Sequence, residues 1–177
     1  MRVAFIATDG VEAVELSEPW TALVEAGAVP TLLSLDSGTI QGFDHLSPGE
    51  TFPVDKSVAH AHADDYRALV LPGGVANPDR LRTDGGVLDF LRAVTEAGTP
   101  IGVICHGPWT LVSAGLVDGR RMTSWPSLRD DLVNAGADWV DEEVVVDDSG
   151  PNVIVSSRRP DDLPAFCKAI VERFESD

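Results

Sequence analysis

Lysine is nearly absent from this chain of 177 residues, and basic side chains are scarce as a group. Lys56 and Lys168 are the only lysines, and lysine and arginine together number 13 against 29 aspartate and glutamate residues. The resulting net charge of −16 at pH 7 repels the phosphate backbone of nucleic acids. We therefore expect no nucleic acid among the partners of this protein.

Long apolar runs are missing as well, and no segment approaches the roughly 20 apolar residues that a membrane-spanning helix requires. Residues 1–7 are mostly apolar, but the chain turns acidic at Asp9 and shows no small-residue cleavage site. We therefore expect a first strand here rather than a signal peptide. The sequence predicts neither a membrane anchor nor a membrane partner.

Cysteine is also rare, and Cys105 and Cys167 lack the spacing of a metal-binding pair. His60 and His62 have no third ligand nearby, so we expect them in a solvated loop rather than at a metal ion. Isolated cysteines are typical of a reducing compartment. We therefore expect a cytoplasmic protein with no metal and no cofactor.

What the sequence does contain is a regular alternation of strand-like and helix-like segments, with no linker or repeat. Almost wholly apolar segments, typical of parallel strands buried on both faces, occupy residues 3–7, 30–35, 68–71 and 100–105. Apolar residues three and four apart predict helices near residues 87–94, 126–133 and 163–174. Residues 41–62 lack helical periodicity and are expected to hold a small hairpin or insertion. The alternation predicts one α/β domain over residues 1–177, a doubly wound, flavodoxin-like α/β/α sandwich with a mostly parallel central sheet.

The sharpest chemical signal follows the fourth predicted strand. Cys105 comes directly after this strand, and a predicted helix begins after Gly107-Pro108. A nucleophile at a tight strand-to-helix turn forms a nucleophile elbow, in which Gly107 permits the turn. We expect the helix N-terminus to lower the pKa of the Cys105 thiol, although a free cysteine can also be a simple core residue. Cys167, on the apolar stripe of the last predicted helix, is expected to be core packing.

Other candidate groups follow the first and third predicted strands. Glu12 and Glu15 are both placed to approach the elbow, and helical spacing alone does not choose between them. Gly73 and Gly74 either form a simple turn or allow backbone N–H groups to approach a reacting carbonyl closely. A glutamine-amidotransferase triad needs a histidine far downstream of the cysteine, and only His106 follows Cys105.

Several motifs together resemble the ThiJ/PfpI superfamily, which shares the class I glutamine amidotransferase-like fold and includes the PfpI intracellular peptidases and protein deglycases. The motifs extend almost from end to end of the chain and include residues 10–16, 69–74, 104–108, 113–115, 129–131, 134–136, 143–147 and 156–163. The resemblance implies that Cys105 is the nucleophile and that Glu15, rather than Glu12, is a buried acid that hydrogen-bonds its sulfur. It further implies an oxyanion pocket formed by the N–H groups of Gly73, Gly74 and His106.

The chain departs from the PfpI pattern at two positions. Asp79 stands near the place of a glutamate that completes a Cys-His-Glu triad from a neighbouring subunit, so Asp79 either orients His106 across an interface or caps the short helix after Pro78. Trp125 stands where the peptidases carry a tyrosine, so the site lacks that hydroxyl. Both changes weaken the case for peptidase activity.

The resemblance therefore implies a cofactor-independent, stress-related cysteine hydrolase that acts on a small carbonyl or peptide substrate. Its activity would be of the glyoxalase or deglycase type, or that of an intracellular protease or amidase. It also implies self-association as a homodimer or homohexamer. The alternative is a redox-sensing or chaperone-like stress protein that uses the oxidation of Cys105 and needs no turnover.

Overall fold

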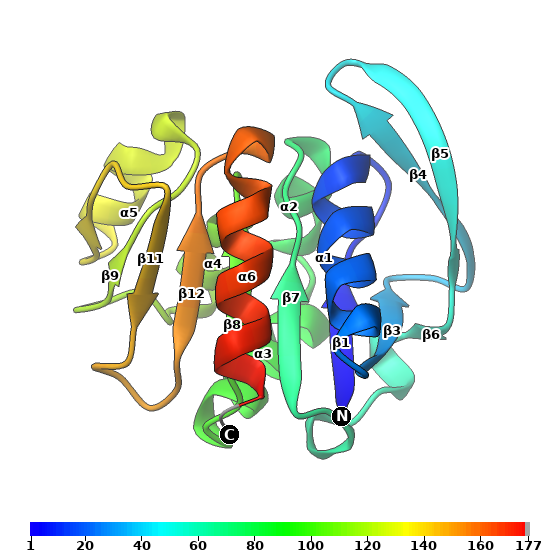
Figure 1. Ribbon diagram of the computed structural model, residues 1–177, viewed down its shortest axis with the longest axis horizontal. Helices are drawn as coiled ribbons and strands as arrows, with labels where there is room; N and C mark the ends of the chain where they lie inside the picture. The colour runs from blue at the N-terminus through cyan, green and yellow to red at the C-terminus, as the bar shows by residue number, and fades with distance from the viewer. Residues whose placement is uncertain (176–177) are drawn as a thin grey trace.

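The computed structural model describes residues 1–175 and contains one large central sheet (Figure 1). The sheet has seven strands in the order β11-β12-β8-β7-β1-β3-β6. Their bounds are β1 (Arg2–Ile6), β3 (Val29–Ser34), β6 (Lys56–Ser57), β7 (Ala68–Leu71), β8 (Ile101–Ile104), β11 (Val144–Asp147) and β12 (Ile154–Ser157). All neighbouring strands are parallel except the antiparallel pair β11 and β12. The predicted mostly parallel sheet is therefore confirmed.

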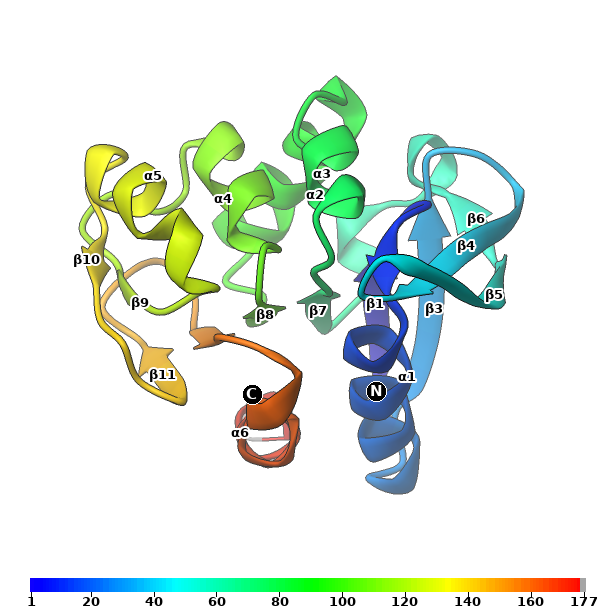
Figure 2. The ribbon, with the colours of Figure 1, turned by 90° about the horizontal axis from the view of Figure 1, so that it is seen from above.

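Helices cover both faces of this sheet, as the view from above shows (Figure 2). One face carries α1 (Ala13–Glu25) and α6 (Leu163–Phe174), and the other carries α2 (Ala76–Leu81), α3 (Gly85–Glu96), α4 (Pro108–Ala114) and α5 (Arg129–Asn134). Short 3₁₀ turns lie at η1 (Val58–His60), η2 (Ala63–Asp65), η3 (Pro126–Leu128) and η4 (Pro160–Asp162). This three-layer arrangement is the expected doubly wound sandwich.

The alternation of side chains along β1 explains why a sheet with two covered faces forms. Val3 and Phe5 join the apolar cluster under α1 and α6, whereas Ala4 and Ile6 join the cluster under α3 and α4. Successive residues of a strand point to opposite faces, so an unbroken apolar segment fills both cores at once. Residues 3–7 are thus buried central structure.

A smaller sheet lies beside the loop that follows β1. It pairs β2 (Val11–Glu12) with β4 (Gly38–Asp44), and β4 with β5 (Ser47–Val54), so β4 and β5 form a hairpin. A third, two-stranded sheet pairs β9 (Arg121–Met122) with β10 (Asp138–Trp139). The hairpin expected within residues 41–62 is confirmed, although its first strand begins earlier, at Gly38.

One expectation at the helices needs correction. Val133, in the helix predicted near residues 126–133, is 49% exposed. Cys167 is half-buried, packs against the apolar cluster under α1 and α6, and lies opposite residues 17–25 of α1. His60 and His62 are exposed, as predicted.

Within residues 1–175, no helix has the length and apolarity needed to cross a membrane.

Candidate active site

The tight strand-to-helix turn expected at Cys105, here called the elbow, is present at the end of β8. Cys105 has a φ of +62°, a conformation that residues with a side chain rarely adopt. Two backbone hydrogen bonds hold it there: its N–H donates to Ser157 O at 3.1 Å, and its carbonyl accepts from Trp125 N at 2.9 Å. A Cβ on Gly107 would lie 2.7 Å from Leu71 O, so the turn requires a glycine at that position. The predicted strained turn is thus built into the sheet edge.

Glu15 is the carboxyl that the fold brings to this thiol. It lies in the first turn of α1, is fully buried, and its Oε2 accepts a hydrogen bond from Gly73 N at 2.9 Å. Burial raises its pKa to about 8, although hydrogen bonds with Cys105 and with the Gly73 N–H act in the opposite direction. At neutral pH this carboxyl is therefore largely protonated.

Glu12, three residues earlier, faces a different neighbour. Its carboxylate accepts the N–H of His45 at 3.3 and 3.2 Å, and the Nδ1 atom of His45 lies 3.5 Å away. Because α1 begins only at Ala13, Glu12 belongs to β2 and its side chain meets the tip of the β4–β5 hairpin. The structure thus resolves the choice that sequence spacing left open: Glu15 lies against the thiol and Glu12 does not.

Cys105 and Glu15 form a coupled buried pair. Burial raises the pKa of the Cys105 thiol, the charge and hydrogen bond of Glu15 raise it further, and the N–H groups of Gly74 and His106 lower it. Burial and the neighbouring acid thus raise the pKa of the thiol overall, while the N–H of His106, just before α4, acts in the expected lowering direction. Such a pair accommodates one negative charge far more easily than two.

The two glycines after β7 approach this pair closely. A Cβ on Gly73 would lie 2.5 Å from Glu15 Oε2, and a Cβ on Gly74, whose φ is +78°, would lie 2.3 Å from Gly10 O. The N–H of Gly74 faces the Cys105 sulfur, as does that of His106. The N–H of Gly73, in contrast, is occupied by Glu15. The N–H of Gly74 also forms a hydrogen bond with Glu15. Of the three N–H groups expected to form an oxyanion pocket, that of His106 therefore faces the Cys105 sulfur without also binding Glu15.

His106 lies between two tryptophans. Its Nδ1 is 3.2 Å from the Cys105 sulfur, its ring stacks on Trp125 at 5.6 Å, and Trp109 packs against it edge-on at 5.2 Å. Burial lowers the pKa of His106 to about 4, so the imidazole is neutral at physiological pH. Sequence reasoning missed Trp109, whose indole N–H donates to Asp131 at 2.8 Å.

Asp79 does not join this group of side chains. It is exposed on α2, and within residues 1–175 its side chain forms no hydrogen bond or ion pair and does not line the pocket described below. The alternative of a helix cap is wrong, because α2 begins at Ala76, before Pro78, and Val75 occupies the cap position. Within one chain Asp79 is thus free of His106.

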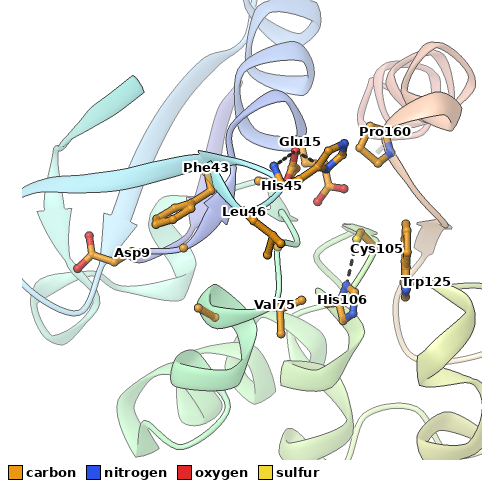
Figure 3. Close-up of a pocket in the computed structure, with 14 residues that line it drawn as sticks. Asp9, Glu15, Phe43, His45, Leu46, Val75, Cys105, His106, Trp125 and Pro160 are labelled. Atoms are coloured by element: carbon orange, nitrogen blue, oxygen red, sulfur yellow. Dashed lines mark hydrogen bonds and ion pairs between the residues drawn. The ribbon is translucent and has the colours of Figure 1, made fainter. Parts of the chain in front are cut away.

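A pocket of about 490 Å³ opens above the thiol (Figure 3). The elbow and Trp125 lie at one end of it, Asp9 lies at the other, and side chains from the hairpin tip and the start of α2 lie between them. Its lining consists of Asp9, Gly10, Glu12, Glu15, Phe43, His45, Leu46, Gly74, Val75, Ala76, Cys105, His106, Trp125 and Pro160. The sequence gave no signal for the hairpin residues, because their place at the pocket depends on how the hairpin folds over β2.

Three potential metal ligands meet beside the pocket. Atoms of Glu12, Asp44 and His45 lie within 4.8 Å of one another, but two of these residues are exposed. The carboxylate of Glu12 already binds the N–H of His45. This arrangement is accounted for by the hairpin contact alone.

Comparison with known proteins agrees with this geometry. The sequence profile of the DJ-1/PfpI family matches residues 1–173. The chain belongs to the DJ-1/PfpI family. It is 42% identical over 172 residues to a Pyrococcus abyssi protein named a deglycase, which covers 97% of this chain and 98% of that protein. It is 39% identical to Bacillus subtilis YraA, whose name describes a candidate cysteine protease, over 93% of each chain.

The fold comparison places the chain in the same DJ-1/PfpI family. The crystal structure of Drosophila melanogaster DJ-1beta superposes with a TM-score of 0.87 at 27% identity. The superposition covers 99% of this chain and 91% of that one. The flavodoxin-like sandwich predicted from the sequence is therefore shared with a solved member of the family.

Proposed function

We propose that this protein is a cofactor-independent cysteine enzyme that acts on carbonyl compounds, with deglycase-type activity as the first choice. The observation that carries the proposal is the buried pair of Cys105 and Glu15, in which the acid lies against the thiol at the end of an open pocket. The names of the relatives from Pyrococcus abyssi and Bacillus subtilis support a hydrolase of this kind.

The pair supplies both the nucleophile and the proton that the reaction needs. In the reactive form Glu15 is ionised, and it accepts the thiol proton as the Cys105 sulfur attacks. The sulfur then forms a bond to the carbonyl carbon, and the π electrons of the C=O bond move onto the oxygen. The N–H groups of Gly74 and His106 face this position and stabilise the oxyanion, and Glu15 returns its proton to it.

Amide substrates follow a different second step, in which the oxyanion is not protonated. Its electrons re-form the C=O bond, the C–N bond breaks, the departing nitrogen takes the proton that Glu15 accepted from the thiol, and the acyl group remains on sulfur as a thioester. Water then attacks this thioester and restores the Cys105 thiol. His106, neutral and 3.2 Å from the sulfur, is the second group in reach that can carry a proton.

Substrates in this proposal are small reactive carbonyls such as methylglyoxal and their adducts with proteins. Peptides are the second choice, since Trp125 offers no hydroxyl at the site and Asp79 is remote from His106 within one chain. A purely redox-sensing role is not favoured, because relatives about 40% identical to this chain are named as deglycases or as a cysteine protease.

Self-association into a dimer or hexamer is part of the proposal. Asp79 is exposed on α2 next to Val75, which lines the pocket mouth and is 57% exposed. A neighbouring subunit seated on this edge would bring its own Asp79 toward the pocket. The free state of Cys105 and Cys167 supports a cytoplasmic location.

The test is the rate of methylglyoxal loss in an amine-free buffer, with the wild type, Cys105→Ala and Glu15→Gln. We expect saturable loss in the wild type and background rates in both variants. Loss at the same rate in Cys105→Ala would refute a cysteine enzyme for this substrate. Background rates in all three proteins would refute methylglyoxal as a substrate. Peptide hydrolysis would then be the activity to test, with Asp79→Asn as the next variant.

A further inference from the structure

The charges that line the pocket are of one sign. Asp9, Glu12 and Glu15 contribute carboxyl groups, and no lysine or arginine is among the residues of chain segment 1–175 that line it. Arg80, which lies outside the lining, is 3.9 Å from Asp9, with both side chains more than half exposed. An exposed pair of this kind is screened by solvent and contributes little.

The two histidines of the pocket do not reverse this sign. Burial lowers the pKa of His106 to about 4, so its imidazole carries no charge at neutral pH. His45 lies at the hairpin tip with 78% of its side chain exposed, where water screens it. A ligand with a carboxylate or phosphate group therefore finds no fixed cation in the pocket.

Glu12 is the carboxylate that the pocket shields best from water apart from Glu15. Its side chain is 9% exposed, and its partners are the N–H and the Nδ1 atom of His45. The backbone of β2 fixes it, since Glu12 pairs with Phe43 of β4. A buried, immobile charge acts on a ligand more strongly than a surface charge does.

Apolar side chains surround the rest of the opening. Phe43, Leu46, Val75 and Trp125 line it, and three of these are strongly exposed: Leu46 at 95%, Val75 at 57% and Trp125 at 37%. A ligand that covers them loses its contact with water. An anion would then lose its hydration without gaining a cationic partner, which is costly.

Glu15 adds a second carboxyl beside the proposed reacting group. Its Oε1 atom is fully buried and accepts no hydrogen bond from an N–H or O–H group of residues 1–175. An atom without accessible surface does not contact a ligand directly, so Glu15 acts on a ligand at a distance, through its charge when it is ionised. That charge also opposes the approach of a carboxylate or phosphate.

We propose that this pocket selects carbonyl substrates by charge: it admits neutral and positively charged compounds, excludes carboxylated and phosphorylated ones, and owes this discrimination chiefly to Glu12. The proposal rests on the proposed function in treating Cys105 as the reacting group. It goes beyond that function in naming which carbonyl compounds enter and which side chain sorts them.

Charged thiol reagents test the proposal without requiring turnover. In a Cys167→Ser background, Cys105 is treated at low ionic strength and pH 8 with a trimethylammonium-ethyl or a sulfonatoethyl methanethiosulfonate. Mass spectrometry follows the modification of Cys105. The rate for each reagent is divided by the rate at which the same reagent modifies 2-mercaptoethanol. Two opposite probe charges near one buried carboxylate predict a normalised preference for the cation on the order of tenfold or more.

Glu12→Gln assigns this preference to its source, and Asp44→Asn is the matched control. Gln keeps the size of Glu12 and can still accept the N–H of His45. Asp44→Asn removes an equal charge from the same hairpin tip but outside the pocket lining. We expect Glu12→Gln to reduce the preference severalfold and Asp44→Asn to leave it nearly unchanged. Asp9→Asn, which retains the oxygen that accepts Gln41 N, is the second pocket variant and should reduce it less.

Several outcomes would overturn the inference. Equal normalised rates for the two reagents in the wild type would show that the pocket does not select by charge. Equal decreases of the preference in Glu12→Gln and Asp44→Asn would show that the preference reflects only the net charge of the molecule. A parallel turnover assay compares methylglyoxal with the anion glyoxylate. Turnover of methylglyoxal without probe selectivity refutes the charge selection and leaves the proposed function standing. Probe selectivity without any turnover supports the charge selection and refutes the proposed function for methylglyoxal.

Discussion

The two ends of the pocket are built from different parts of the fold. At the thiol end, Cys105, Glu15 and Gly73 come from the ends of central strands and the first turn of α1, and both ionisable side chains are no more than 5% exposed. At the hairpin end, Leu46 is 95% exposed and the side chain of His45 is 78% exposed. The contrast separates a buried thiol end, which we propose as the reacting centre, from an exposed rim.

The reason lies in the neighbours that each end has. β7 and β8 each lie between two other strands of the central sheet, with helices on both faces. The hairpin is held to the body by β2, through the pairs Val11 with Gly42 and Glu12 with Phe43. Reacting atoms need positions fixed to a fraction of an ångström, whereas a rim can vary with the substrate. Changes at the thiol end should therefore abolish turnover, and changes at the rim should alter selectivity.

The largest difference is expected between two identical substitutions three residues apart. Glu15→Gln keeps a group that can accept the Gly73 N–H but cannot transfer a proton, so we expect kcat/KM for methylglyoxal to fall about 10²- to 10⁴-fold. Glu12→Gln makes the same change at the rim and should alter kcat/KM for this neutral substrate by less than about tenfold. Steady-state kinetics of both variants measure this, and equal losses would refute the division into centre and rim.

The second comparison uses two glycines with nearly the same φ. Gly74 has a φ of +78° and Gly115 has a φ of +75°, but a Cβ at Gly74 would lie 2.3 Å from Gly10 O while Gly115 has open space. Gly115→Ala should cost about 1 kcal/mol of unfolding free energy for its φ alone. Gly74→Ala adds a backbone clash and should cost about 3 kcal/mol or more.

Urea unfolding of Gly74→Ala and Gly115→Ala, with the wild type as reference, measures both values. Equal losses would mean that the loop after β7 yields easily to the added methyl group. The thiol end would then be less rigid than its burial implies.

These packed regions are also the ones that sequence reasoning predicted best. Strands that lie between two others are buried on both faces, so residues 68–71 and 101–104 are recognisable as apolar runs without any knowledge of their partners. Cys105 is the residue immediately after the second of these runs, so its place at the sheet edge was predictable too. The rim was not predictable in the same way, because β2 has two residues and the position of Leu46 depends on how the hairpin crosses the pocket.

Sequence reasoning failed in a second way where distant segments meet. The direction of the pKa shift at Cys105 depends on Glu15, 90 positions earlier, and on burial that the whole sheet produces. The occupation of the Gly73 N–H by Glu15 has the same origin. Trp109 reads as a helix residue in the sequence, and its contact with His106 is evident only from the packing of α4. A local pattern locates such residues but does not give their environment.

The pH dependence of the unfolding free energy tests whether the ionisable side chains at the thiol end are buried. The pKa of Glu15 is raised to about 8 in the folded chain, so its contribution to stability is complete below its ordinary pKa of 4.5 and is lost as the pH rises to about 8. The pKa of His106 is lowered to about 4, so its contribution is complete above 6.5 and is lost as the pH falls toward 4.

Glu15→Gln should therefore flatten the decline in unfolding free energy between pH 4.5 and 8, and His106→Gln the decline between pH 6.5 and 4. Urea unfolding at a series of pH values gives the measurement. Glu12→Gln is the rim control for the alkaline limb. An unchanged alkaline limb in Glu15→Gln would show that Glu15 is not buried as a neutral acid.

The smallest effect is expected at the tip of the hairpin. Leu46 buries almost none of its side chain, so Leu46→Ser should change the unfolding free energy by less than about 0.5 kcal/mol. A substrate that covers Leu46 gains apolar contact there, and losing about 1 kcal/mol of it corresponds to about a fivefold change in KM. We expect this change with the bulky phenylglyoxal and a smaller one with methylglyoxal. Val133→Ser, which removes an exposed apolar side chain from α5, is the control and should leave both KM values unchanged. An equal KM ratio for the two substrates in the wild type and Leu46→Ser would exclude the hairpin tip from substrate contact.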